Sequence, residues 1–159
     1  MPINYKKMLV LLIITSITLF CVWQNNDLVI NKINYINAKI PAEFNGYKIV
    51  QISDLHNKNF GKNQERLLKK IKEISPDIIV VTGDLIDRRK YDLETAIVFI
   101  RGAQKIAPVY YISGNHEAWS GDYNNISHQL LNSGARIVDD RKFELTKKIV
   151  LQIIFSKEA

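Results

Sequence analysis

The sequence predicts an α/β fold with a parallel sheet, preceded by one N-terminal helix apolar enough to cross a membrane. Three apolar runs typical of buried strands occupy residues 49–53, 77–82 and 109–113. A segment with helical spacing of apolar residues lies between each pair of runs, and neighbouring runs begin about 30 residues apart, as in βαβ units. This alternation is the main evidence for the fold class.

The N-terminal apolar stretch covers residues 8–23, contains no charged side chain and follows Lys6 and Lys7. As a helix it would be about 24 Å long, slightly shorter than a typical hydrocarbon core. We interpret it as a membrane anchor, with a cleaved signal peptide and a buried core helix as alternatives. The preceding lysines predict a single-pass protein of the cell membrane, with a cytoplasmic N-terminus and everything after Asp27 outside the cytoplasm.

Composition narrows the possible partners. The formal net charge is +6, and no stretch interleaves basic with aromatic residues, so we expect no specific nucleic-acid binding. The positive charge suits an anionic membrane surface or a phosphorylated substrate. The single cysteine, Cys21, excludes an intrachain disulfide. The sequence does not predict an oligomeric state.

The first half of the domain begins with imperfect alternation over residues 28–40, which predicts a half-exposed edge strand ending at Pro41. A strand over residues 47–53 follows. Apolar residues at helical spacing then predict a helix over residues 63–74, with Asn63 as its N-cap. The nearly β-branched run 77–82 predicts a strand that is buried on both faces.

The second half continues the same alternation. A helix is predicted over residues 92–106, capped by Asp92, and Pro108 then opens the third strand. A further helix covers residues 123–133 and stops at Gly134. The remaining strands are predicted at residues 136–138, 141–146 and 147–155.

Polar clusters follow the first three strands. Their members are carboxylates, imidazoles and one amide: Asp54 and His56; Asp84 and Asp87; Asn115, His116 and Glu117. The carboxyl ends of parallel strands share one edge of a sheet, so these clusters should converge. Such donors suit two divalent ions, Mn, Fe, Zn or similar. Asp84 could bridge both ions, Asn115 could offer a neutral oxygen, and His116 could face the substrate.

With these motifs, residues 40–140 resemble the calcineurin-like metallophosphoesterases. Ile-Ser-Asp-Leu-His after an apolar helix resembles their bacterial membrane-associated branch. The resemblance implies the N-terminal half of an αββα sandwich, with a dinuclear metal centre that hydrolyses phosphate mono- or diesters. By motif, Asp54 and His56 would bind the first metal, Asp84 would bridge, Asn115 would bind the second, and His116 would act as the acid.

The same resemblance assigns supporting roles around these residues. Asp87 would position its loop and the nearby histidines, and Glu117 would cap or brace the following turn. Arg88 would either steer phosphate or remain solvated.

The family pattern also includes one further histidine and a Gly-His-x-His motif. This sequence has three histidines, and His128 lies in a helical pattern without the required context. We therefore expect a membrane anchor over residues 1–27 and a partial metallophosphoesterase domain over residues 28–159, from a truncated or frameshifted product, a short variant or a fragment. The alternative to an enzyme is a catalytically inactive membrane-anchored truncation product or assembly partner.

Overall fold

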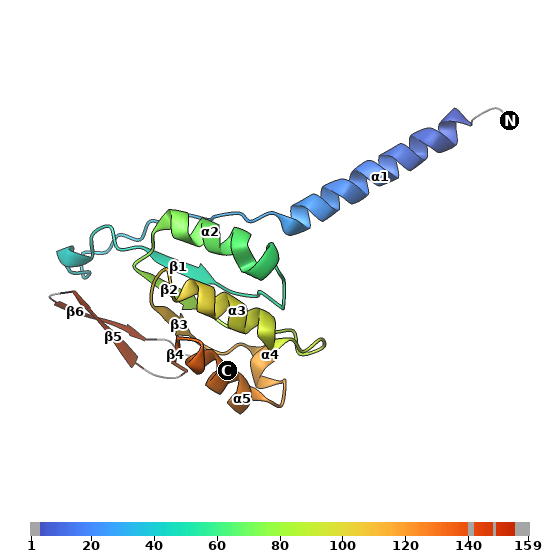
Figure 1. Cartoon of the computed structure of the whole chain (residues 1–159). Coiled ribbons are helices and arrows are strands. Elements are labelled where there is room, and N and C mark those ends of the chain that lie inside the picture. Colours follow the sequence, from blue (N-terminus) through green and yellow to red (C-terminus); the bar gives the residue numbers. More distant parts are fainter. Residues whose placement is uncertain (1–3, 140–141, 148, 155–159) are drawn as a thin grey trace. The chain divides into compact units, whose positions relative to one another are not determined.

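The computed structural model describes residues 4–139 and the backbone of residues 142–147 and 149–154 (Figure 1). The chain divides into two compact units, Met1–Asn34 and Tyr35–Ala159. The first is built around one helix, and the second carries the sheet.

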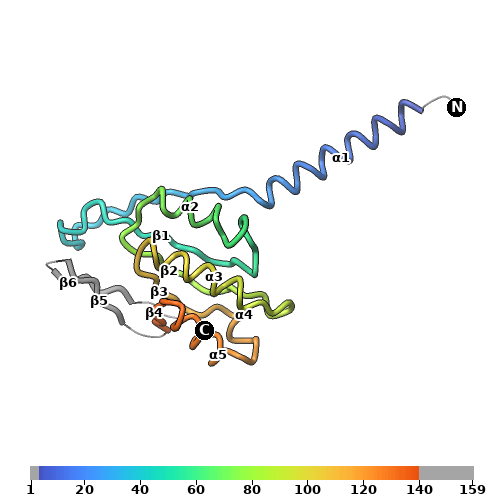
Figure 2. The backbone as a smooth tube through the Cα atoms, in the orientation of Figure 1, coloured from blue at the N-terminus to red at the C-terminus, as the bar shows by residue number. Residues whose placement is uncertain are grey.

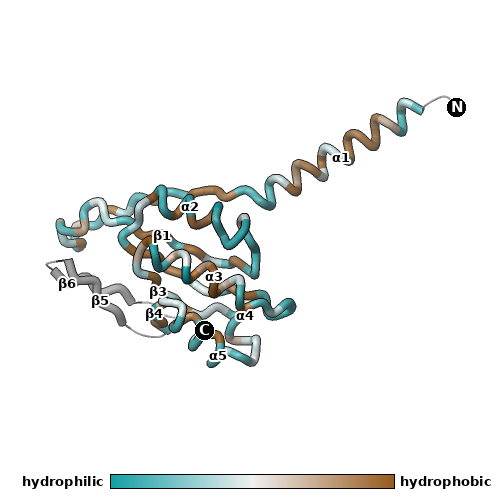
Figure 3. Tube along the Cα trace, viewed as in Figure 1, coloured by the Kyte–Doolittle hydropathy of each residue, from teal (hydrophilic) through white to brown (hydrophobic). Residues whose placement is uncertain are grey.

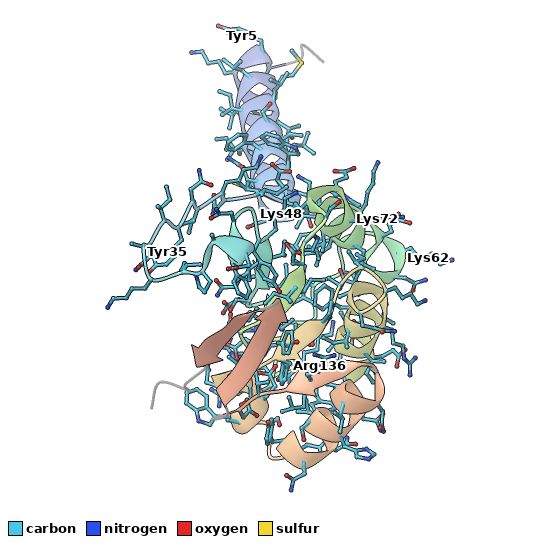
Figure 4. The ribbon with its side chains drawn as sticks, turned by 90° about the vertical axis from the view of Figure 1, so that its left-hand side faces the viewer. Tyr5, Tyr35, Lys48, Lys62, Lys72 and Arg136 are labelled. Atoms are coloured by element: carbon cyan, nitrogen blue, oxygen red, sulfur yellow. The ribbon has the colours of Figure 1, made fainter. Side chains whose placement is uncertain are left out.

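Helix α1 (Tyr5–Asn26) is longer than the predicted stretch at residues 8–23. The Asn4 side chain caps it by accepting the backbone N–H of Lys7. Its 22 residues span about 33 Å, enough for a bilayer core. Apolar residues run along most of its length in Figure 3, and its side chains project on all sides in Figure 4. Its length and composition suit a membrane crossing, and they would suit a signal sequence equally.

The second unit contains a parallel sheet with the strand order β1-β2-β3-β4, which confirms the predicted α/β class (Figure 1). The strands are β1 (Ile49–Ile52), β2 (Ile78–Val81), β3 (Val109–Tyr111) and β4 (Ala135–Ile137). The backbone trace in Figure 2 follows these strands in chain order. Because all four run the same way, the loops that follow them lie along one edge of the sheet.

The connecting helices are α2 (Glu65–Ile74), α3 (Leu93–Ala103) and α5 (Tyr123–Asn132). One-turn elements add η1 (Ala42–Phe44), η2 (Lys62–Gln64) and α4 (Asn115–Ala118). Helix α3 is packed against both α2 and α5. The strands lie in the sheet in the same order as in the chain. In such a sheet, right-handed crossovers place the connecting helices on one face.

The two predicted helix caps had different outcomes. Asp92 caps α3 as expected, because its side chain accepts the backbone N–H of Thr95. The prediction for Asn63 is wrong, because this residue lies inside η2 and Gln64 takes the N-cap position of α2. The Gln64 side chain is fully buried and bonds instead to the backbone of Lys58 and Phe60. Its amide therefore holds the preceding loop.

The central strands β2 and β3 are buried on both faces, as the β-branched run at residues 77–82 predicts for β2, whereas β1 and β4 are partly exposed. Alternate strand residues point to opposite faces, so Ile79 and Val81 form one layer, with neither side chain exposed. A cluster of apolar side chains forms the other layer: Phe44, Ile78, Val80, Tyr110, Ile112 and Val138. This rigid sheet supports the loops at its carboxyl edge.

The predicted edge strand at residues 28–40 is wrong, because this segment forms no strand. Ile33 and Ile36 are both strongly exposed. In an extended chain, Val29, Ile33 and Tyr35 would share one face while Ile36 would point to the other, so no single face can be buried. The segment therefore lacks the packing that would stabilise a strand.

The strands predicted after residue 140 are confirmed as β5 (Lys142–Lys147) and β6 (Ile149–Ile154). They pair antiparallel with each other in a two-stranded sheet of their own.

Candidate metal centre

The loops after β1, β2 and β3 bring one residue each into a compact group. Potential ligand atoms of His56, Asp84 and His116 all lie within 4.8 Å of one another, and the three side chains are half-buried. The two imidazole rings meet edge to face, with centroids 4.4 Å apart. The group contains one carboxylate and two imidazoles, a donor set that suits a transition-metal ion.

The backbone of these loops is held in an uncommon conformation. Asp54, His56 and Asp84 have φ values of 56°, 45° and 53°, in the left-handed region. Each such residue costs on the order of 1 kcal/mol and persists only where the surroundings enforce it. The His56 N–H donates to the Asp84 carbonyl at 2.9 Å, and the Asp54 N–H donates to the Gly83 carbonyl at 3.3 Å. These bonds continue the β1–β2 pairing past the strand ends and fix both loops.

Two glycines let the second and third loops touch backbone to backbone. A Cβ at Gly83, where φ is 89°, would lie 2.3 Å from the Gly114 nitrogen. A Cβ at Gly114 would lie 2.2 Å from Asp84 Oδ1. This close approach allows Asp84 Oδ1 to accept the backbone N–H of His116 at 2.9 Å.

The Glu117 side chain bonds to the backbone of the same two loops. Its side chain is fully buried and accepts three backbone N–H groups. Oε2 takes those of Asp84 and Gly114, both at 2.8 Å, and Oε1 takes that of Ile86 at 3.1 Å. The Gly114 contact also satisfies the N-cap N–H at the start of α4. The Glu117 carboxylate therefore fixes the backbone on both sides of the site.

His116 is oriented by the loop that follows β2. Its Nδ1 accepts the backbone N–H of Arg88 at 3.2 Å, and Asp87 Oδ1 lies 3.5 Å from the same nitrogen. The backbone N–H of Arg89 holds the pKa of Asp87 below its usual value, and His116 adds to that effect. Asp87 thus lies beside the imidazole as an anion, next to the loop backbone that fixes the ring.

Asp54 and Asn115 lie at the exposed rim of the group. Asp54 Oδ1 is 3.5 Å from His56 Nε2, and its Oδ2 accepts the Ser53 hydroxyl at 2.5 Å. Asn115 begins α4 and is exposed. Within the described residues, Asp54 does not belong to the group of three.

One orphaned atom tests whether a cation fits here. The Nδ1 atom of His56 is buried and has no hydrogen-bond partner among the described residues. Leaving such a group unpaired costs about 1–3 kcal/mol, and binding to a cation would remove that cost. The donor set and this unpaired nitrogen both fit a divalent metal ion.

Sequence reasoning missed several residues that support the rim. Asn57 has φ of 60°; its Oδ1 accepts the Asp87 N–H at 3.1 Å, and its amide donates to the Lys90 carbonyl. Asp139 accepts the Ser113 N–H at 2.7 Å. A signal for Asp139 was available, because it follows β4 as the other polar clusters follow their strands. Asn57 lies one residue beyond the first motif and offered no such signal.

The third histidine lies outside this group. His128 is exposed in α5, and its ring shares a hydrogen bond with Asn132 at 3.2 Å.

Comparison with known proteins adds a second line of evidence. A family model described as calcineurin-like phosphoesterase matches residues 47–154. The uncharacterized metallophosphoesterase Cj0846 of Campylobacter jejuni is 33% identical over 112 residues, which is 69% of this chain and 30% of that protein.

Two further relatives have more descriptive names. The UDP-2,3-diacylglucosamine pyrophosphatase LpxG of Chlamydia trachomatis is 36% identical over 86 residues, covering 50% of this chain and 26% of that protein. A Bos taurus transmembrane protein with metallophosphoesterase domain is 29% identical over 89 residues, covering 55% of this chain and 20% of that protein. The chain thus spans less than a third of the length of each of these relatives.

Proposed function

Because this chain belongs to the calcineurin-like phosphoesterase family, we propose that it contributes to metal-dependent hydrolysis of phosphate mono- or diesters. The observation that carries the proposal is the group formed by His56, Asp84 and His116, one residue from each of three strand ends. Hydrolase activity agrees with the name of the Chlamydia relative.

We assign the metal ligands as follows. His56 and Asp54 would hold a first ion, Asp84 would bridge, and Asn115 would hold a second. The orphaned Nδ1 of His56 supports the first ion, whereas Asp54 lies 3.5 Å from the other ring nitrogen, Nε2. Two bound ions would activate water and neutralise charge on the phosphoryl oxygens.

Within the group of three, we assign His116 to proton transfer and not to metal binding. Its Nδ1 lone pair is engaged by the Arg88 N–H, so a neutral ring carries its proton on Nε2. As an acid the ring would be the imidazolium, with its Nδ1–H facing Asp87, and it would give its Nε2 proton to the leaving oxygen and end as the neutral ring. In both starting forms Nε2 carries hydrogen and so does not ligate a metal. Asp87, 3.5 Å from Nδ1, would stabilise positive charge on this ring.

Membrane attachment would place the reaction near a lipid surface. Helix α1 is long and apolar enough to span a bilayer, and one relative is named a transmembrane protein. With Lys6 and Lys7 at its start, the proposed orientation is N-terminus inside and sheet-bearing unit outside the cytoplasm.

The assay uses the full chain in detergent micelles with Mn²⁺ and two substrates, p-nitrophenyl phosphate and bis-p-nitrophenyl phosphate. His116→Gln should lower turnover by about 10²–10⁴-fold, the usual contribution of a general acid. The matched control His128→Gln, on exposed α5, should leave it unchanged. Mn²⁺ binding measured by calorimetry should survive in His116→Gln and weaken strongly in Asp84→Asn.

Two results would change the assignment. Equal loss of Mn²⁺ binding in His116→Gln and Asp84→Asn would make His116 a ligand. Retained Mn²⁺ binding without any metal-dependent turnover would favour the alternative, a catalytically inactive membrane-anchored product or assembly partner.

A further inference from the structure

An exposed tryptophan lies beside the candidate metal centre and has no part in the chemistry proposed above. Trp119 directly follows α4 and is 63% exposed. Single exposed apolar residues are ordinary, but this one is fixed in place. Its backbone N–H donates to the Asn115 carbonyl at 2.9 Å, and the Arg88 guanidinium lies 5.0 Å from its ring centre.

Both members of this Arg88–Trp119 pair are tied to His116. Trp119 follows His116 by three residues across the turn of α4, a spacing that puts two side chains on one face, with Cβ atoms about 5–6 Å apart. Arg88 donates its backbone N–H to His116 Nδ1. The pair is therefore part of the rim around the proposed proton donor.

Further contacts hold the two loops together. The Tyr91 hydroxyl donates to Asp122 Oδ2 at 2.7 Å and joins the loop after β2 to the segment after α4. Glu117 joins the same two segments at their base. These contacts hold the backbone that carries Trp119, so little conformational freedom would be lost when a ligand contacts the indole.

The indole offers a flat stacking surface three residues after His116, the residue to which the proposed function would bring the phosphoryl group. Arg88 can cover only one face of the ring, and the large exposed fraction leaves surface for a second planar group. Aromatic side chains stack on nucleobases regardless of base identity, because each base has a π-face. A phosphate held near His116 would place a ring that is one sugar away within reach of Trp119.

We infer that Trp119 determines specificity by stacking on the ring of a nucleotide-type phosphate ester. This inference rests on the proposed function, which brings the phosphoryl group to His116. It predicts that a substrate unit with a planar heterocycle binds better than the same phosphate without the heterocycle.

The test compares uridine 5′-monophosphate with ribose 5-phosphate, which share the sugar phosphate and differ in the base. The chain has two tryptophans, so Trp23→Phe leaves Trp119 as the sole indole fluorophore. In the full chain in detergent micelles, uridine 5′-monophosphate should quench Trp119 saturably. It should bind about tenfold more tightly than ribose 5-phosphate by calorimetry.

Variants separate stacking from other effects. Trp119→Ala should bring the affinity ratio of the two ligands close to one, and Trp119→Phe should retain most of it. Tyr35→Ala, another exposed aromatic position, is the matched control and should leave the ratio unchanged. An unchanged ratio in Trp119→Ala, or equal affinities in the unmodified chain, would overturn the inference. So would tighter binding of octyl phosphate than of uridine 5′-monophosphate, because an alkyl chain would then be the favoured occupant.

The ratio also keeps this inference distinct from the proposed function. If the metal site fails to form, both ligands should bind more weakly through their shared phosphate, and the ratio of their affinities should stay the same. Loss of the ratio with retained Mn²⁺ binding and turnover would reject stacking at Trp119 alone.

Discussion

Replacement of Glu117 by glutamine should destabilise the sheet-bearing unit and loosen the candidate metal centre together. The Glu117 carboxylate accepts the N–H groups of Asp84, Gly114 and Ile86 in a fully buried position. A glutamine oxygen in the place of Oε2 could keep two of these bonds. Its NH₂ group would then face the Ile86 N–H, a second donor.

The expected loss of stability follows from the hydrogen bond that the substitution removes. Hydrogen bonds to charged groups contribute about 1.5–3 kcal/mol, and a buried N–H left unpaired costs about 1–3 kcal/mol. We expect Glu117→Gln to lower the free energy of unfolding by about 2–4 kcal/mol. Because the Ile86 N–H loses its partner and the charge that binds the Asp84 and Gly114 N–H groups is removed, the loop after β2 is held less firmly and Mn²⁺ affinity should also fall.

Urea denaturation followed by circular dichroism measures the stability change, and calorimetry measures Mn²⁺ binding. The matched control is Glu73→Gln, on the exposed side of α2, which should change stability by less than about 0.5 kcal/mol. If Glu117→Gln behaves like Glu73→Gln in both measurements, the three hydrogen bonds to Glu117 do not hold the loops and the reasoning is refuted.

Two further predictions concern the loops around the site. Gly83→Ala should lower the free energy of unfolding by at least about 2 kcal/mol. The new Cβ would clash with the Gly114 backbone, and the φ of Gly83 lies in the left-handed region. Gly46→Ala has a similar φ of 74° and open space, so it should cost clearly less by the same urea assay; equal costs would reject the close approach. Burial, with the Asp122 contact second, raises the pKa of Tyr91 from 10.0 to about 12. The protonated form is therefore the stabilised one, so this contribution is present below pH 10 and lost as the pH rises through 12. Tyr91→Phe should show a shallower fall in urea midpoint between pH 9 and pH 12 than the unmodified chain, and an identical fall would contradict the pKa shift.

Much of the sheet could be predicted from sequence, because its signals are local. Continuous β-branched runs mark buried strands, and helical spacing marks the segments between them. Parallel order follows from the lengths of the connections. Convergence of Asp84, His56 and His116 then follows from topology alone, since all three come after strand ends on one edge.

The contacts that shape the site could not be predicted in the same way. The approach of Gly83 to Gly114 and the three N–H groups bound by Glu117 depend on the φ and ψ of loops about 30 residues apart. The error at Asn63 has the same origin, because Gln64 is engaged by a loop that the local pattern does not reveal. The strand predicted at residues 28–40 does not form, because Ile36 breaks the alternation and would point to the opposite face from Val29, Ile33 and Tyr35.

Anomalous diffraction from crystals of the full chain soaked in Mn²⁺ tests the central claim most directly. The account predicts a peak at the carboxyl edge of the sheet, within about 2.0–2.2 Å of a His56 nitrogen and an Asp84 oxygen, with His116 Nε2 outside bonding distance. A peak elsewhere, or no peak when the Mn²⁺ concentration saturates binding in solution, would contradict it.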